Sequence, residues 1–114
     1  MRSLALSLLL TAGLAASAAA APADYPTAVL ADYVLGCMAA RGQTPDALQR
    51  CACSIDRVAA RLPYDDYVKA ETVLRMRRET TGRDQITMFR TSPWAQEMVD
   101  KLRRAQLEAD VECF

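Results

Sequence analysis

Histidine is absent from this chain of 114 residues. Its absence removes the usual general base near neutral pH, the Ser-His and Cys-His nucleophile arrangements, and the commonest ligand of zinc and copper. The chain also has no Gly-rich phosphate loop, no Gly-x-Ser-x-Gly motif and no Cys-x-x-Cys motif. The sequence therefore predicts no catalytic residue, no cofactor and no metal site, and we expect a protein that is not an enzyme.

A charge excess of either sign is missing as well. The chain has 14 basic and 14 acidic residues, and loss of Arg2 with the leader described below leaves the rest close to neutral. Proteins that bind nucleic acid or anionic membrane surfaces usually carry a clear positive excess. We therefore expect neither as a partner.

Residues 1–20 have the pattern of a secretory signal peptide. Arg2 supplies the positive start, residues 4–14 are mostly apolar, and residues 17–23 are small. Cleavage after Ala20 places small side chains at both required positions. The apolar run is short and rich in alanine, whereas a membrane span needs roughly 20 strongly apolar residues. We expect residues 21–114 to be one periplasmic or secreted domain, with no membrane attachment after cleavage.

Four cysteines fall in the exported part of the chain: Cys37, Cys51, Cys53 and Cys113. In an oxidising compartment, four cysteines in a small domain predict two structural disulfides. Cys51 and Cys53 are rotated by about 200° from each other on a helix, so their thiols serve different partners. Because Cys51 faces the first helix, we favour Cys37–Cys51 with Cys53–Cys113. The exchanged pairing, Cys37–Cys53 with Cys51–Cys113, stays open.

Helical periodicity predicts an all-α domain of four helices. Residues 27–40 are apolar almost all round, which predicts a well-buried first helix. Gly42 ends it, Thr44 and Pro45 begin a second helix, and the third spans residues 64–78. A fourth begins at Ser92 and Pro93. The predicted inner faces are Leu48, Cys51, Ala52, Ile55, Val58, Ala59 and Leu62 on the second helix, Tyr67, Ala70, Val73 and Leu74 on the third, and Ala95, Met98, Val99, Leu102, Ala105 and Ala109 on the fourth.

Two groups of residues could carry function. Cys51-Ala-Cys53 could exchange disulfides or, with Met38 or Met88, hold a soft metal such as Cu(I). The second group combines arginines with aromatic and methionine side chains, a composition typical of protein-binding surfaces. It comprises Arg75, Arg77, Arg78, Arg83, Met88, Phe89, Arg90 and Trp94.

Several segments resemble a family of small exported proteobacterial proteins with four cysteines. They are Tyr33-Val-Leu-Gly-Cys-Met38, Cys51-Ala-Cys-Ser-Ile-Asp56, Leu62-Pro-Tyr-Asp-Asp-Tyr67, Leu102-Arg-Arg-Ala-Gln106 and the closing Cys113-Phe114. Members of that family are sometimes found beside quinoprotein (PQQ-dependent) alcohol dehydrogenases. The resemblance implies an accessory role in periplasmic alcohol oxidation, and it carries over no catalytic or ligand position.

The leading hypothesis is a non-catalytic periplasmic accessory factor that binds another periplasmic protein through residues 83–94, with Arg75, Arg77 and Arg78 at the rim of that surface. One alternative is a thiol-disulfide or copper-handling protein that uses Cys51 and Cys53. Another is a structural envelope or stress protein that binds no single partner. A free, reactive cysteine pair would favour the second hypothesis over the first.

Overall fold

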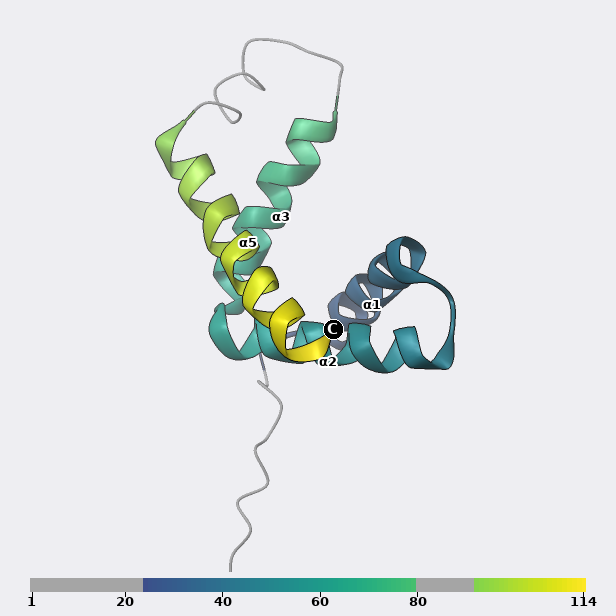
Figure 1. The fold of residues 1–114 in the computed structure, drawn as a ribbon. Helices are drawn as coiled ribbons and strands as arrows, with labels where there is room; N and C mark the ends of the chain where they lie inside the picture. The colour runs from purple at the N-terminus through teal and green to yellow at the C-terminus, as the bar shows by residue number, and fades with distance from the viewer. Residues whose placement is uncertain (1–23, 80–91) are drawn as a thin grey trace, which may run out of the picture.

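The structure, a computed structural model, describes residues 24–79 and 92–114. They form four helices (Figure 1). The helices are α1 (Thr27–Arg41), α2 (Pro45–Arg61), α3 (Tyr64–Arg78) and α5 (Pro93–Cys113). Two disulfides link them, so the predicted all-α fold with four helices and two disulfides is confirmed. The predicted signal peptide lies outside the described residues.

The helix ends follow local side-chain chemistry. Gly42 ends α1 with a φ of 117°, a conformation that a Cβ atom would disfavour. Thr44 then accepts a hydrogen bond from the N–H of Ala47 at 3.0 Å, and Pro45 occupies the first position of α2. Ser92 caps α5 in the same way. These signals place the start of α2 and α5 where the sequence predicts them.

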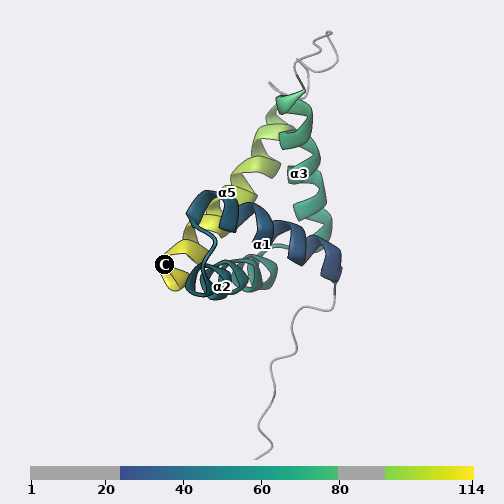
Figure 2. The same ribbon diagram turned by 90° about the vertical axis from the view of Figure 1, so that its right-hand side faces the viewer.

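The four helices form two pairs. α3 and α5 pack against each other, and in Figure 1 they diverge towards their upper ends. α1 and α2 form a hairpin at the lower end of that pair, and α2 packs against both α1 and α5. Figure 2 shows α1 on the outside, with α2 below it and the α3–α5 pair behind it. α2 and α5 are therefore the two helices that each pack against two others.

The main core is formed by residues of α2, α3 and α5, with α2 and α3 each packed against α5. It contains Ile55, Val58, Ala59, Leu62, Tyr67, Ala70, Met98, Leu102, Ala105 and Ala109, together with Tyr25 from the segment before α1. A smaller cluster of Val73, Ala95 and Val99 joins α3 to α5 above it. The predicted inner face of the last helix is confirmed in full, because all six of its residues are buried.

The prediction of a well-buried first helix is wrong. No residue of α1 is buried, although Val29, Leu30, Tyr33 and Val34 pack partly against the core. Leu35 keeps 68% of its surface exposed. The physical reason is position: α1 packs mainly on α2 and lies at the outside of the domain, so its other faces have no neighbouring helix among the described residues.

The predicted inner face of α2 is correct except at Leu48 in its first turn and at Ala52, which is only partly buried. Leu48 is 44% exposed, and Ala47 is buried in its place. Ser54, which the apolar pattern omits, is also buried, and its Oγ lies 3.1 Å from the hydroxyl oxygen of Tyr33. A polar residue can occupy this position because the hydroxyl pair satisfies its hydrogen bonding.

Candidate functional site: a groove between α1 and α3

Each disulfide ties α2 to a different helix. Cys37 of α1 bonds to Cys51 with Cα atoms 5.8 Å apart, and Cys53 bonds to Cys113 at the end of α5 at the same Cα distance. The favoured pairing is thus confirmed, and no cysteine of the chain is free. Structural disulfides of this kind indicate an oxidising, extracytoplasmic compartment. None of the described helices is long and apolar enough to cross a membrane.

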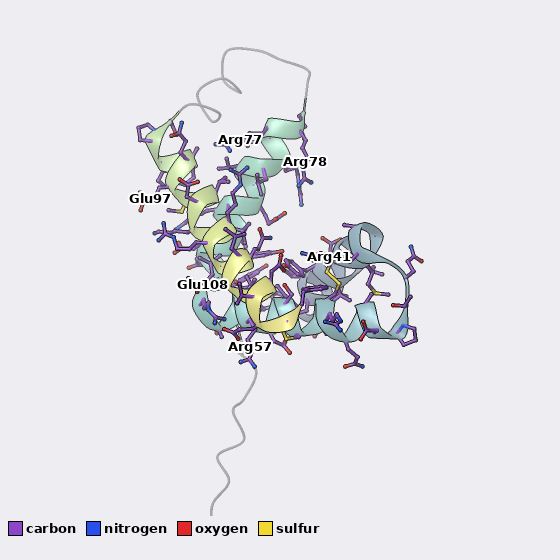
Figure 3. All side chains as sticks on the ribbon, viewed as in Figure 1. Arg41, Arg57, Arg77, Arg78, Glu97 and Glu108 are labelled. Atoms are coloured by element: carbon purple, nitrogen blue, oxygen red, sulfur yellow. A yellow bond between two sulfur atoms is a disulfide. The ribbon has the colours of Figure 1, made fainter. Side chains whose placement is uncertain are left out.

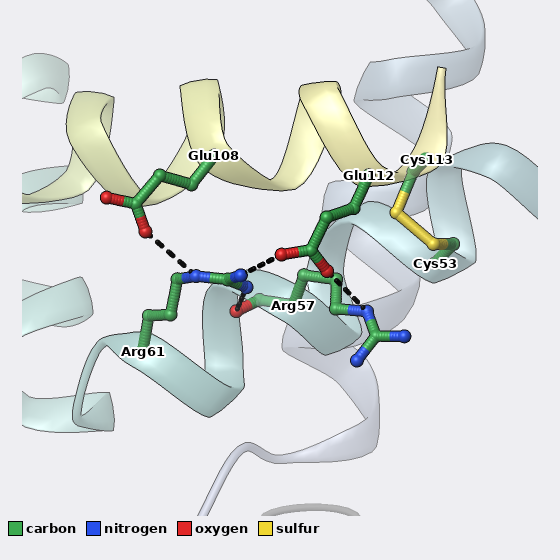
Figure 4. A network of polar contacts seen from close by, with 6 residues as sticks. All are labelled: Cys53, Arg57, Arg61, Glu108, Glu112 and Cys113. Atoms are coloured by element: carbon green, nitrogen blue, oxygen red, sulfur yellow. Dashed lines mark hydrogen bonds and ion pairs between the residues drawn. A yellow bond between two sulfur atoms is a disulfide. The ribbon is translucent and has the colours of Figure 1, made fainter.

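An ion-pair network lies beside the second disulfide (Figure 4). Arg61 of α2 contacts Glu108 at 2.9 Å and also contacts Glu112, which in turn lies 3.0 Å from Arg57. Arg61 additionally donates a hydrogen bond to the carbonyl oxygen of Arg57 at 3.1 Å. The end of α5 is therefore held on α2 by a covalent bond and by ion pairs.

α1 is held mainly near its two ends. Before it, the Tyr25 hydroxyl donates a hydrogen bond to the carbonyl oxygen of Leu62 at 2.8 Å, and the Tyr25 ring packs edge-on against Tyr64. At its last residue, Arg41 pairs with Asp110 at 2.6 Å and lies 4.1 Å from the centre of the Phe114 ring. These contacts, with the Cys37 bridge, position the helix without burying its length.

A groove runs between α1 and α3 and has two connected parts. The part near the start of α1 has a volume of about 420 Å³, and the part towards its end about 440 Å³. Both are lined by Asp32 of α1 and by Tyr67 and Glu71 of α3. On the α1 side, the small residues Ala28, Gly36 and Ala40 recur at a spacing of four around Asp32. The same helix also lines the groove with Val29, Tyr33, Cys37 and Arg41.

Tyr67 forms the floor of the groove. Only 6% of its surface is exposed, and its ring packs against Tyr25 at 5.3 Å between centroids. Burial, and after it the negative charge of Glu71, raises the pKa of Tyr67 well above its ordinary value, with a smaller contribution from Asp32. The hydroxyl therefore stays protonated at neutral pH, and within the described ranges it makes no hydrogen bond.

Four charged side chains of the groove have no ion-pair partner among the described residues, whereas Arg41 and Asp110, which also line it, pair with each other. Asp32, Glu71, Arg75 and Arg78 all line it, and none of them makes an ion pair with another described residue. Glu71 and Arg75 have the favourable spacing of four on one helix, yet they are not within ion-pair distance. Folding thus leaves carboxylates, guanidinium groups and a phenol facing the same space.

The structure brings only part of the predicted partner-binding surface together. Arg75 and Arg78 line the groove, whereas Arg77 lies on the side of α3 towards α5 (Figure 3). Trp94, at the start of α5, is 47% exposed. Arg83, Met88, Phe89 and Arg90 lie outside the described residues. Binding by this set stays a prediction.

The groove itself was not predicted from the sequence. Asp32, Tyr67 and Glu71 come from two helices far apart in the chain, and Tyr67 was assigned only to the core. The one local signal is the repeat of small or short residues at positions 28, 32, 36 and 40, which marks a helix face that another chain segment can approach closely. In the described ranges no group of acidic or cysteine side chains could hold a metal ion.

Comparison of the chain with protein-family models, with curated proteins and with solved structures gives no match in any of the three.

Proposed function

We propose that the protein works without catalysis, by binding another exported protein as an accessory or assembly factor. One observation carries this proposal: α1 is an almost wholly apolar helix, yet none of its residues is buried by the rest of the domain. A helix that is apolar all round is normally enclosed on all sides. A partner would supply the missing cover.

The exposed face of α1 is continuous with the groove. It consists of Ala28, Ala31, Asp32, Leu35, Gly36, Ala39 and Ala40. Leu35 is the large apolar side chain of this face, and isolated exposed leucines are common on protein surfaces. Here, however, Leu35 lies within a stripe of small residues that bury little area themselves and allow another backbone to come close. Such a stripe beside an anchor residue favours contact with a helix or an extended segment.

The end contacts of α1 fit this role. Because Tyr25 and Arg41 hold the helix at its ends and Cys37 ties it to α2, its orientation does not depend on burial of the outer face. A preformed surface loses little conformational entropy on binding. Arg75 and Arg78 on the opposite wall of the groove then contribute charge, as part of the surface that the sequence predicts.

The resemblance noted above suggests one class of partner. If the family association with quinoprotein alcohol dehydrogenases extends to this chain, the partner belongs to a periplasmic alcohol-oxidation system. The binding proposal does not require that identity, because it depends only on α1 and the groove.

Two matched variants test the proposal. Leu35 of α1 and Leu107 of α5 have nearly the same exposure, 68% and 67%, so Leu35→Glu and Leu107→Glu add the same charge at equally exposed helical positions. Each tagged protein is expressed with its native leader, purified from the periplasm under mild conditions, and the co-purified proteins are quantified by mass spectrometry. We expect Leu35→Glu to lose a partner that the wild type and Leu107→Glu retain.

Other results of these experiments would support one of the other functional hypotheses. Loss of the partner in Leu107→Glu alone would move the interface to α5 and overturn the role of α1. Equal profiles for all three proteins would favour a structural envelope protein. Alkylation of Cys51 and Cys53 in protein taken directly from the periplasm would favour the thiol-disulfide or copper alternative, because all four cysteines are bonded in the structure.

A further inference from the structure

Hydrogen-bond acceptors on the side chains of Asp32, Glu71 and Tyr67 gather in the groove, and they have no partner among the described residues. Asp32 approaches it from α1 and Glu71 from α3, and both carboxylates lie near the phenol of Tyr67. Tyr67 lines both parts of the groove with only 6% of its surface exposed, and its hydroxyl makes no hydrogen bond to another described residue. The hydroxyl oxygen itself stays open to solvent, so a group that enters the groove can bond to it in place of water.

The number and type of these acceptors fit an ammonium group. A lysine side chain carries three N–H donors and no acceptor, and the groove offers two carboxylates and one phenol oxygen. An arginine side chain presents its donors in a planar fork that suits one carboxylate bidentately, which matches acceptors on two separate helices less well. The geometry favours lysine over arginine on this ground.

The surrounding walls define the segment that carries the lysine. Gly36 is open to the groove, since a Cβ atom built on it would meet nothing within 4 Å. Together with Ala28 and Ala40 it leaves room for a main chain beside α1. Arg75 and Arg78 limit the groove on the α3 side and repel further positive charge. The expected segment therefore has one lysine among small or acidic neighbours, rather than a basic run.

We propose that the groove binds a lysine side chain of the partner protein, with its ammonium group between the carboxylates of Asp32 and Glu71 and its hydrogen bonding completed by Tyr67. This inference rests on the proposed binding function and names the chemistry that the groove selects. Hydrogen bonds from a charged donor to carboxylates in a partly enclosed site are the strong ones.

The test uses small probes on the mature, disulfide-bonded protein. Binding is followed by NMR titration with N-acetyl-lysine N-methylamide, with the uncharged norleucine analogue and with the glutamate analogue. Asp32→Asn and Glu71→Gln each remove one carboxylate charge, and Asp100→Asn serves as the control because Asp100 is exposed on α5 outside the groove. Thermal unfolding of each variant confirms that the fold is intact.

We expect the lysine probe to shift signals of Tyr67 and its neighbours and to bind at least about tenfold more tightly than the norleucine probe. Either groove variant should weaken lysine binding by about tenfold or more, while Asp100→Asn should leave it unchanged. Equal binding of the lysine and norleucine probes, tighter binding of the glutamate probe, or no binding would overturn the inference, as would unchanged binding by both groove variants.

The two proposals fail in distinguishable ways. If the lysine probe does not bind but Leu35→Glu still loses its partner, the groove chemistry is wrong and the role of α1 stands. If the lysine probe binds as expected but Leu35→Glu keeps every co-purified protein, the cation site stands and the proposed docking on α1 fails.

Discussion

α1 and α2 are neighbouring helices of similar length, 15 and 17 residues, joined by a short turn and a disulfide. α2 buries six of its residues and α1 buries none. The difference is opposite to what apolar content alone predicts, because α1 is the more apolar of the two. α2 has its apolar side chains on one face, and that face meets both α1 and α5. α1 has apolar side chains all round and packs mainly on α2.

The comparison separates two ways of holding a helix in place. α2 is held by the burial of its face, with Cys51, Ile55 and Val58 at 2% exposure or less. α1 is held by a disulfide and by contacts near its ends. A helix held in the second way can keep a face free for a partner, which is why we connect α1 with function and α2 with stability.

The largest expected effect comes from cutting the covalent link between the two helices. Cys37→Ala with Cys51→Ala opens a loop of 14 residues in sequence separation, which should lower the free energy of unfolding by about 3 kcal/mol. Because α1 buries so little, we expect its backbone amides to lose most of their protection in hydrogen exchange, while those of α2 and α3 remain protected. Urea unfolding gives the free energy, and exchange mass spectrometry gives its location.

The second disulfide supplies the control for that experiment. Cys53→Ala with Cys113→Ala removes a link across 60 residues, so the expected loss is about 4 kcal/mol. That loss should be spread over α2 and α5, which share the core. If α1 stays protected after loss of the first bridge, then that bridge is not what holds it, and the comparison between the helices breaks.

A smaller effect on stability is expected from the difference in burial between the two helices. Val58 of α2 is fully buried, whereas Val34 of α1 is only partly so. Val58→Ala should cost about 2 kcal/mol, since it removes packed methyl groups and leaves a cavity. Val34→Ala should cost less than about 1 kcal/mol, because water already reaches its side chain. Equal losses in chemical unfolding would show that α1 is buried more deeply than the structure indicates.

The smallest predicted effect concerns the contact that precedes α1. Burial, followed by the charges of Asp66 and Tyr64, raises the pKa of Tyr25 from 10.0 to about 12. The neutral phenol is thus the favoured form in the folded state, and its contribution to stability is complete below pH 10 and is lost as pH rises from 10 to 12.

Tyr25→Phe tests this contact. At pH 7 the variant should be less stable than the wild type by about 1 kcal/mol, because the hydrogen bond to the Leu62 carbonyl is gone. At pH 11 the wild type should have lost about 1 kcal/mol through ionisation of Tyr25 in the unfolded state, so the difference between the two proteins should close. Urea unfolding at both pH values, with short incubation at pH 11, measures it. A difference that is constant with pH would contradict the raised pKa.

The sequence was a good guide wherever local chemistry decides the structure. Thr44, Pro45, Ser92 and Pro93 placed the starts of two helices correctly, because capping acts within a few residues. The opposite orientations of Cys51 and Cys53 follow from helix geometry alone and led to the correct pairing.

The sequence was a poor guide wherever packing against another helix decides which residues are buried. An apolar pattern shows that α1 can be buried, but the number of neighbouring helices determines whether it is. The groove depends on the distance between α1 and α3, which no local pattern encodes, so Tyr67 was recognised as a core residue and its place in the lining of the groove was missed. Leu48 was misassigned for the same reason, because in the first turn of α2 the rest of the domain covers the side that carries Ala47 and leaves Leu48 exposed.

Site-specific photo-crosslinking in the periplasm tests the central claim most directly, namely that the face of α1 left exposed by folding is a binding surface. Benzoylphenylalanine replaces Leu35 in one protein and Leu107 in another, at matched exposure, and crosslinked products are identified after irradiation of intact cells. The account predicts a discrete crosslinked protein from position 35 and none from position 107. A product from position 107 alone, or none from position 35, would contradict it.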